Sequence, residues 1–118
     1  MRSSILLLSA VVAAAAGLFG MPGAIAAPTL DPVAIKAAKT PADHEAIARA
    51  YQEEATNLEK EAAWHKELAE SYAAPGGEAW MAGQVKHCDA VVSDLKAAAR
   101  EDRRLAAAHL KMAKKATQ

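Results

Sequence analysis

The sequence predicts an all-α protein whose body is one antiparallel helical hairpin with an alanine-rich, coiled-coil-like seam, and we expect two copies to dimerise into a four-helix bundle. Three observations support this prediction. Alanine accounts for 32 of the 118 residues and only five residues are aromatic, which favours helices over a β-sandwich. Neither Gly nor Pro occurs between Pro41 and Pro75. On both sides of Pro75-Gly76-Gly77, residues recur with a seven-residue period, which is typical of two packed helices joined by a turn.

The composition excludes several classes of protein. The 14 basic and 14 acidic residues cancel, and the pI is near 6.9. The chain therefore lacks the positive charge by which many proteins hold nucleic acid, and we expect no nucleic-acid partner. A single cysteine cannot form an intramolecular disulfide, which excludes a disulfide-stapled scaffold. The length allows one small domain.

Residues 1–26 are predicted to be a signal peptide. Arg2 supplies the positive start, an apolar run covers residues 5–19, and Ala24-Ile25-Ala26 fits a small-residue cleavage site. The run is shorter than the roughly 20 apolar residues of a membrane-spanning helix, so we expect cleavage and no stable membrane span afterwards. The mature chain is then periplasmic or secreted. In composition it resembles short exported Ala/Glu/Lys-rich helical proteins of Gram-negative bacteria.

The remaining chain divides into an N-terminal arm and the hairpin domain. Residues 27–39 form the arm, in which Asp31-Pro32 predicts a short helix because Asp caps helices and Pro favours their first turn. Residues 40–118 form the hairpin. Thr40, Pro41 and Asp43 predict the start of a first helix over about 41–74. A second helix is expected over about 78–115, where lysines suit its negative C-terminal pole.

Both helices carry the same heptad pattern. Large seam positions recur at His44, Tyr51, Leu58, His65 and Tyr72 in the first helix, and at Met81, Cys88, Leu95, Asp102 and His109 in the second. Small seam positions lie four residues after each, at Ala48, Ala55, Ala62 and Ala69, and at Val85, Val92, Ala99, Ala106 and Ala113. Folding at Gly76-Gly77 is expected to set the large positions face to face, in the pairs Tyr72–Met81, His65–Cys88, Leu58–Leu95, Tyr51–Asp102 and His44–His109. The small residues between them let the helices approach closely.

A second apolar set flanks the seam, and we call it the outer stripe. It comprises Ile47, Trp64 and Leu68 on the first helix, and Trp80, Val91, Ala98, Leu105 and Met112 on the second. An alanine-rich seam buries little apolar area, so the hairpin alone is expected to be marginally stable. Either the N-terminal arm or a second copy covers the stripe. We favour a homodimer, with Trp64, Leu68, Trp80, Val91 and Leu105 at the interface, and keep a different protein partner as a further possibility.

Histidine and cysteine fall at two levels of the predicted hairpin. His65, His87 and Cys88 lie near the turn, whereas His44 and His109 lie about 31 Å away along the helices. Imidazole and thiolate are ligands of Zn, Cu and Ni, so the first group is a candidate metal site and the second pair another. The simpler reading is that these groups are buried spacers that hydrogen-bond each other and fix the helix register. No other cofactor is implied.

The remaining polar seam residues are interpreted structurally. Tyr51 and Asp102 are predicted to pair through a hydroxyl–carboxylate hydrogen bond. No arrangement typical of a nucleophilic catalyst occurs, and we predict no catalytic residues and no enzyme activity. The leading function is a self-associating or partner-binding module, and the alternative is a small transition-metal binding protein. A membrane-surface or holdase-like role for the tryptophan-containing stripe is a third hypothesis.

Overall fold

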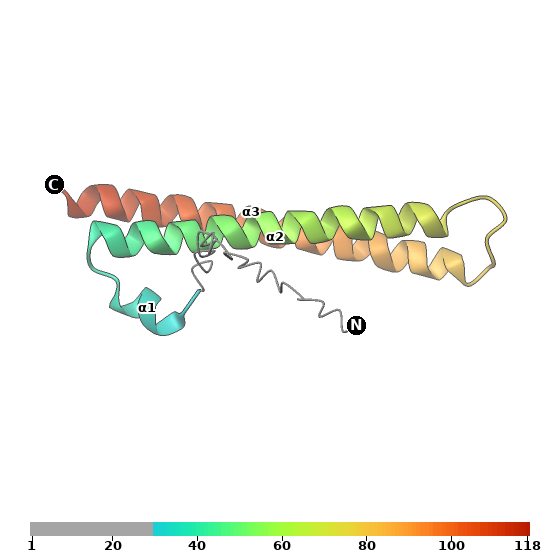
Figure 1. Ribbon diagram of the computed structural model, residues 1–118, viewed down its shortest axis with the longest axis horizontal. Helices are drawn as coiled ribbons and strands as arrows, with labels where there is room; N and C mark the ends of the chain where they lie inside the picture. The colour runs from blue at the N-terminus through green and yellow to red at the C-terminus, as the bar shows by residue number, and fades with distance from the viewer. Residues whose placement is uncertain (1–29) are drawn as a thin grey trace, which may run out of the picture.

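The computed structural model of the protein describes residues 30–118, and the expected signal peptide and the first three residues of the arm lie outside the described residues. The elements are α1 (Pro32–Ala37), α2 (Pro41–Tyr72) and α3 (Met81–Ala116), and no strand occurs within 30–118. Helices α2 and α3 run antiparallel side by side along their whole length (Figure 1). The predicted all-α hairpin is therefore confirmed. We call the end with the start of α2 and the C-terminus the open end, and the other the turn end.

Helix α1 is a short helix beside the N-terminal part of α2 (Figure 1). It begins where the sequence places a cap, because the Asp31 carboxylate accepts a hydrogen bond from the Val33 amide at 2.9 Å and Pro32 needs no such partner. It ends at Ala37, and the chain then reverses into α2. None of its six residues is buried, so α1 lies on the hairpin rather than within its core.

The start of α2 is stabilised by a complete capping box. The Thr40 hydroxyl accepts from the Asp43 amide at 3.1 Å, while the Asp43 carboxylate accepts from the Thr40 amide at 2.9 Å and the Lys39 amide at 3.0 Å. The amide of Lys39, followed by the amide and hydroxyl of Thr40, lowers the pKa of Asp43 to about 2. The local sequence thus fixes this helix start by itself.

The turn is longer than the sequence predicts. Helix α2 ends at Tyr72 rather than near residue 74, and α3 starts at Met81 rather than at residue 78. Pro75 disfavours helix at the residue before it, and Gly76 takes a φ of +85°, a conformation that glycine adopts most readily. Residues 77–80 then cross to the second helix, and the Met81 amide donates to the Glu78 carbonyl at 2.9 Å. No side chain caps α3, because Trp80 occupies the cap position.

The core is a row of alanines along the contact between α2 and α3. Ala48 and Ala55 are fully buried, and Ala62 and Ala99 are 1 % exposed. Cys88 and Ile47 are the larger buried apolar residues, and no large side chain within the described chain is completely buried. The seam therefore joins two closely approaching backbones and contributes little apolar area per layer.

The register of the two helices differs from the face-to-face prediction. The His109 ring contacts His44, as predicted, but it also stacks on Tyr51 with ring centroids 5.9 Å apart. His109 consequently lies between two successive large positions of α2, at the level of Ala48. At this level, a large side chain of α3 therefore lies beside a small position of α2 rather than directly opposite a large one.

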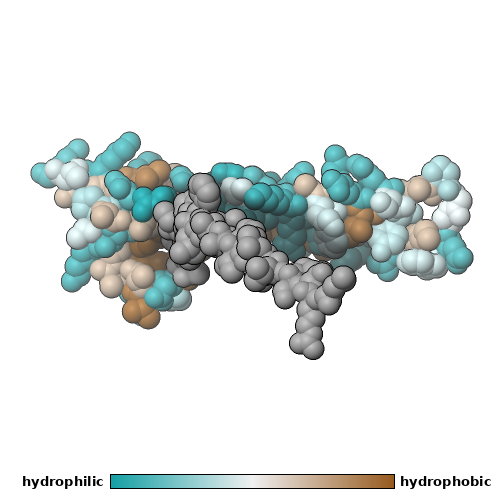
Figure 2. Space-filling view, in the orientation of Figure 1, coloured by the Kyte–Doolittle hydropathy of each residue, from teal (hydrophilic) through white to brown (hydrophobic). Residues whose placement is uncertain are grey.

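The surface seen in Figure 2 is largely hydrophilic, with hydrophobic residues gathered at the open end around α1 and in a smaller group nearer the turn. Within residues 30–118, the helices contain no apolar stretch of the length that crossing a membrane requires.

Candidate functional site

The most developed polar site is the histidine pair at the open end. His44 projects from the first turns of α2 and His109 from the last turns of α3. Their Nδ1 atoms are 3.1 Å apart, a hydrogen-bond distance, and their ring centroids are 5.3 Å apart. Of the two candidate histidine and cysteine groups in the sequence, this is the one that the structure brings together.

Only one proton fits between the two facing nitrogens. One Nδ1 must carry the hydrogen and donate, and the other must accept through its lone pair, so the two rings cannot both be protonated on Nδ1 in this arrangement. Burial, and then the proximity of His44, lower the pKa of His109 below its usual value. His109 is the one buried polar or charged residue of the described chain, at 9 % exposure, and Tyr51 packs on its ring.

The expected Tyr51–Asp102 hydrogen bond is not formed in the described structure. Tyr51 stacks on His109 instead, since the register places His109 rather than Asp102 against it. Asp102 is half-buried, and no side-chain hydrogen bond or ion pair of residues 30–118 includes it. Burial, followed by the negative charge of Glu101, raises the pKa of the Asp102 carboxyl.

The turn-end group of His65, His87 and Cys88 is not assembled into a site. Cys88 is buried, at 3 % exposure, whereas His87 is exposed. The Nδ1 atom of His65 is buried without a hydrogen-bond partner, and Trp64 packs edge-on against the His65 ring with centroids 4.9 Å apart. Neither a hydrogen bond between His65 and Cys88 nor a cluster of three potential metal ligands occurs in the part of the chain that the structure describes.

Helix geometry explains why the three ligands do not meet. Consecutive residues on an α-helix point about 100° apart, so His87 and Cys88 cannot both point into the seam. Cys88 takes the inward direction and His87 the outward one. Adjacency in the sequence therefore does not bring His87 and Cys88 into one site. His44 and His109, which are distant in sequence, do come together.

The outer stripe carries the largest exposed side chains. Trp64 is 55 % exposed, Trp80 is 56 % exposed and Met112 is 45 % exposed. Leu68, Val91 and Leu105 are half-buried. Tyr72 and Trp80 meet across the turn with ring centroids 6.1 Å apart, so part of this surface is held in place. The turn-end half of the stripe is thus an ordered apolar surface that faces outward.

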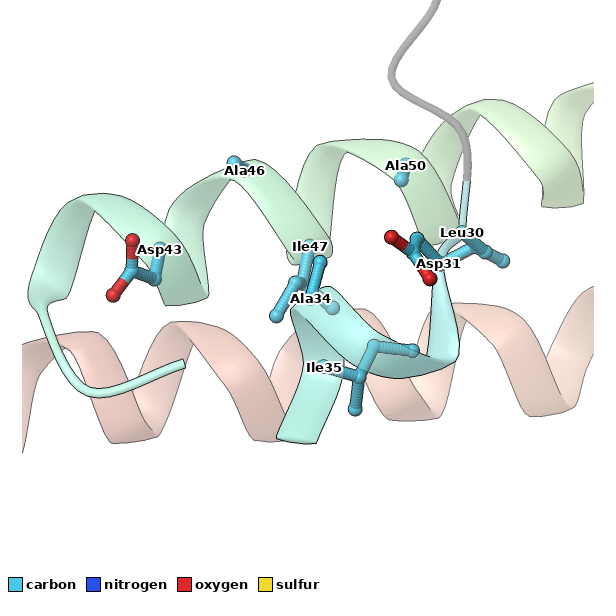
Figure 3. Close-up of a pocket in the computed structure, with 8 residues that line it drawn as sticks. All are labelled: Leu30, Asp31, Ala34, Ile35, Asp43, Ala46, Ile47 and Ala50. Carbon is cyan, nitrogen blue, oxygen red and sulfur yellow. The ribbon is translucent and has the colours of Figure 1, made fainter. Parts of the chain in front are cut away.

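The described part of the N-terminal arm, residues 30–39, covers only the open-end part of the stripe. Leu30, Asp31, Ala34 and Ile35 lie over Asp43, Ala46, Ile47 and Ala50, as Figure 3 shows. The cavity between the two groups has a volume of about 160 Å³. Ile47 is buried there, while Trp64 lies roughly 21 Å further along α2, at 1.5 Å per residue from Ala50.

Glu59 of α2 and Arg103 of α3 form an ion pair between the helices that the sequence pattern did not predict. The Arg103 Nε and Nη2 atoms donate to the Glu59 carboxylate at 3.1 and 2.7 Å. This contact lowers the pKa of Glu59 and raises that of Arg103. Both residues directly follow large seam positions, Leu58 and Asp102, and this placement is the signal that identifies such a pair.

No protein-family model matches the chain, and no curated protein or solved structure matches it.

Proposed function

We propose that the protein is an exported, non-enzymatic module that acts by pairing with a second copy through the turn-end half of its outer stripe. The observation that carries this proposal is that small side chains fill the core while the largest side chains are exposed. The seam buries alanines, whereas Trp64 and Trp80 are more than half exposed. A single hairpin therefore leaves more than half of the surface of each of its two largest side chains in water.

The energetics favour association over an isolated hairpin. Burial of apolar surface contributes about 25 cal/mol per Å², and an alanine offers little surface to bury. A tryptophan side chain offers about 150–250 Å², so the two exposed tryptophans of each copy represent the largest gain still available to the molecule. Burying them requires a second surface of similar length and apolar character.

A second copy supplies such a surface. By the heptad spacing, Trp64 and Leu68 on α2 lie on the same side of the hairpin as Val91 near the start of α3. A two-fold axis would bring this set against itself and enclose both pairs of tryptophans in a four-helix bundle. The arm offers no equivalent cover, since α1 packs against the open end.

Export is the second part of the proposal, and it rests on the signal-peptide pattern of residues 1–26. Burial of Cys88 in the seam suits an oxidising compartment, because it shields the lone thiol from forming a disulfide with another molecule. Expression of the full chain in a Gram-negative host tests this part. We expect the protein in the periplasm, with the mass of a chain beginning at Ala27. Cytoplasmic protein with the uncleaved mass would contradict it.

Sedimentation velocity of the exported protein at micromolar concentration tests association. We expect a dimer, and Trp64→Glu or Val91→Glu should shift it towards monomer. Ala63→Glu and Ala107→Glu are matched controls, because both positions are exposed and lie on the other side of their helices. A monomeric wild type, or equal disruption by the controls, would contradict the proposed interface.

A further inference from the structure

The His44–His109 pair has the geometry of two ligands converging on one point. Its members come from different helices and are 65 residues apart in sequence, yet the same ring atom of each, Nδ1, faces the other at 3.1 Å. Each Nδ1 has a lone pair whenever its ring carries the hydrogen on Nε2. The pair is thus interpretable either as a hydrogen bond alone or as a site in which a cation replaces the shared proton.

We propose that His44 and His109 form an interhelical chelate for a divalent transition metal of the Zn²⁺, Ni²⁺ or Cu²⁺ class. Metal–imidazole bonds are about 2.0–2.1 Å long, so two such nitrogens lie about 2.9 Å apart at a right angle and about 3.4 Å apart at a tetrahedral angle. The observed separation of 3.1 Å falls between these values. The ion would lie beside the line joining the two nitrogens, with water in its remaining positions.

For a metal ion to replace the proton between the rings, both Nδ1 lone pairs must be free. The ring that donates in the hydrogen bond gives up its Nδ1 hydrogen to solvent. A neutral ring takes a hydrogen back from solvent on Nε2, whereas an imidazolium already carries one there and releases one proton. Both Nδ1 lone pairs then point at the ion, and both rings are neutral.

The surrounding structure holds the ligands in position. His109 is buried, and Tyr51 stacks on its ring at an interplanar angle of 26°. His44 directly follows Asp43 of the capping box that fixes the start of α2. Little ordering is then left for metal binding to impose, which favours affinity. The turn end has no counterpart, because the buried Nδ1 of His65 faces no second ligand.

The test is thermal unfolding, followed by circular dichroism, of the untagged exported protein after treatment with EDTA. Addition of about 1 mM Zn²⁺ or Ni²⁺ should raise the Tm by about 5 °C, and Mg²⁺ should not, because it prefers oxygen ligands. His44→Gln and His109→Gln should each abolish the shift. The matched controls His65→Gln and His87→Gln should retain it. A shift that survives in His44→Gln, disappears in His65→Gln, or is absent from the wild type would overturn the proposal.

A second measurement on the wild type avoids dependence on variant folding. Imidazole ¹⁵N chemical shifts distinguish a protonated, a free and a metal-bound ring nitrogen. Titration with Zn²⁺ should move the Nδ1 resonances of His44 and His109 together and leave those of His65 and His87 in place. Movement of only the His65 and His87 signals, or of none, would contradict the site. Since the proposed dimer is formed at the other end of the hairpin, its failure would leave this result unaffected.

Discussion

At the open end of the hairpin, His44 and His109 pair, Tyr51 stacks on His109, and α1 covers the flanking Ile47. At the turn end, the same heptad places a histidine with an unpartnered buried Nδ1 atom at His65, and leaves Trp64 and Trp80 more than half exposed. The two halves share one repeat and one alanine seam. One alanine seam is therefore compatible with two different sets of contacts, which depend on the larger side chains at and beside it.

The largest expected effect tests whether the seam is alike in both halves. Ala48→Leu at the open end and Ala62→Leu at the turn end should each lower the free energy of unfolding by about 1–3 kcal/mol, because a larger side chain overpacks a close helix contact. Urea unfolding at one protein concentration measures this. The exposed Ala63→Leu should change stability by less than about 0.5 kcal/mol. A stabilised Ala62→Leu would show that the turn end is loosely packed.

Leucine substitutions at the two histidine levels should have opposite signs. In the presence of EDTA, His44→Leu should lower the free energy of unfolding by about 1 kcal/mol, because it leaves a buried nitrogen of His109 without a partner. His65→Leu should raise it by about the same amount, since its Nδ1 is already unpartnered. Urea unfolding distinguishes the cases, and equal destabilisation by both substitutions would remove the contrast between the ends.

The two ends also differ in how their helices start. At the open end α2 has a capping box, whereas at the turn end α3 has no capping side chain. Thr40→Ala should lower the free energy of unfolding by about 1 kcal/mol at neutral pH. Because the folded pKa of Asp43 lies below its unfolded value, the capping stabilisation is present above about pH 4 and is lost as the pH falls to about 2. Urea unfolding at several pH values should show this loss in the wild type and a weaker one in Thr40→Ala.

The smallest expected effect concerns Asp102, whose folded pKa is raised by burial. Its ionised form opposes folding, so this contribution diminishes as the pH falls through the folded pKa towards 3.8. Asp102→Asn should therefore raise stability at pH 7 by up to about 0.5 kcal/mol and give no gain near pH 3. A loss of stability at pH 7 would mean that Asp102 has a favourable contact that the described structure lacks.

The sequence by itself determined the secondary structure and its approximate limits. Thr40 and Asp43 cap α2 through neighbouring backbone groups, and Gly76 permits the reversal, so short-range interactions fix both features. The seven-residue spacing likewise identified the alanine seam, because helical periodicity places those residues on one face. Even the His44–His109 contact followed from this spacing.

The register between the two helices, and the contacts that depend on it, followed from the packing of the folded hairpin. A shift of about half a heptad relative to the face-to-face prediction brings His109 against Tyr51 and separates Tyr51 from Asp102. The heptad pattern is compatible with both registers, because each aligns the same two faces. Packing of large side chains over small ones favours the observed register, and that choice involves atoms of both helices at once.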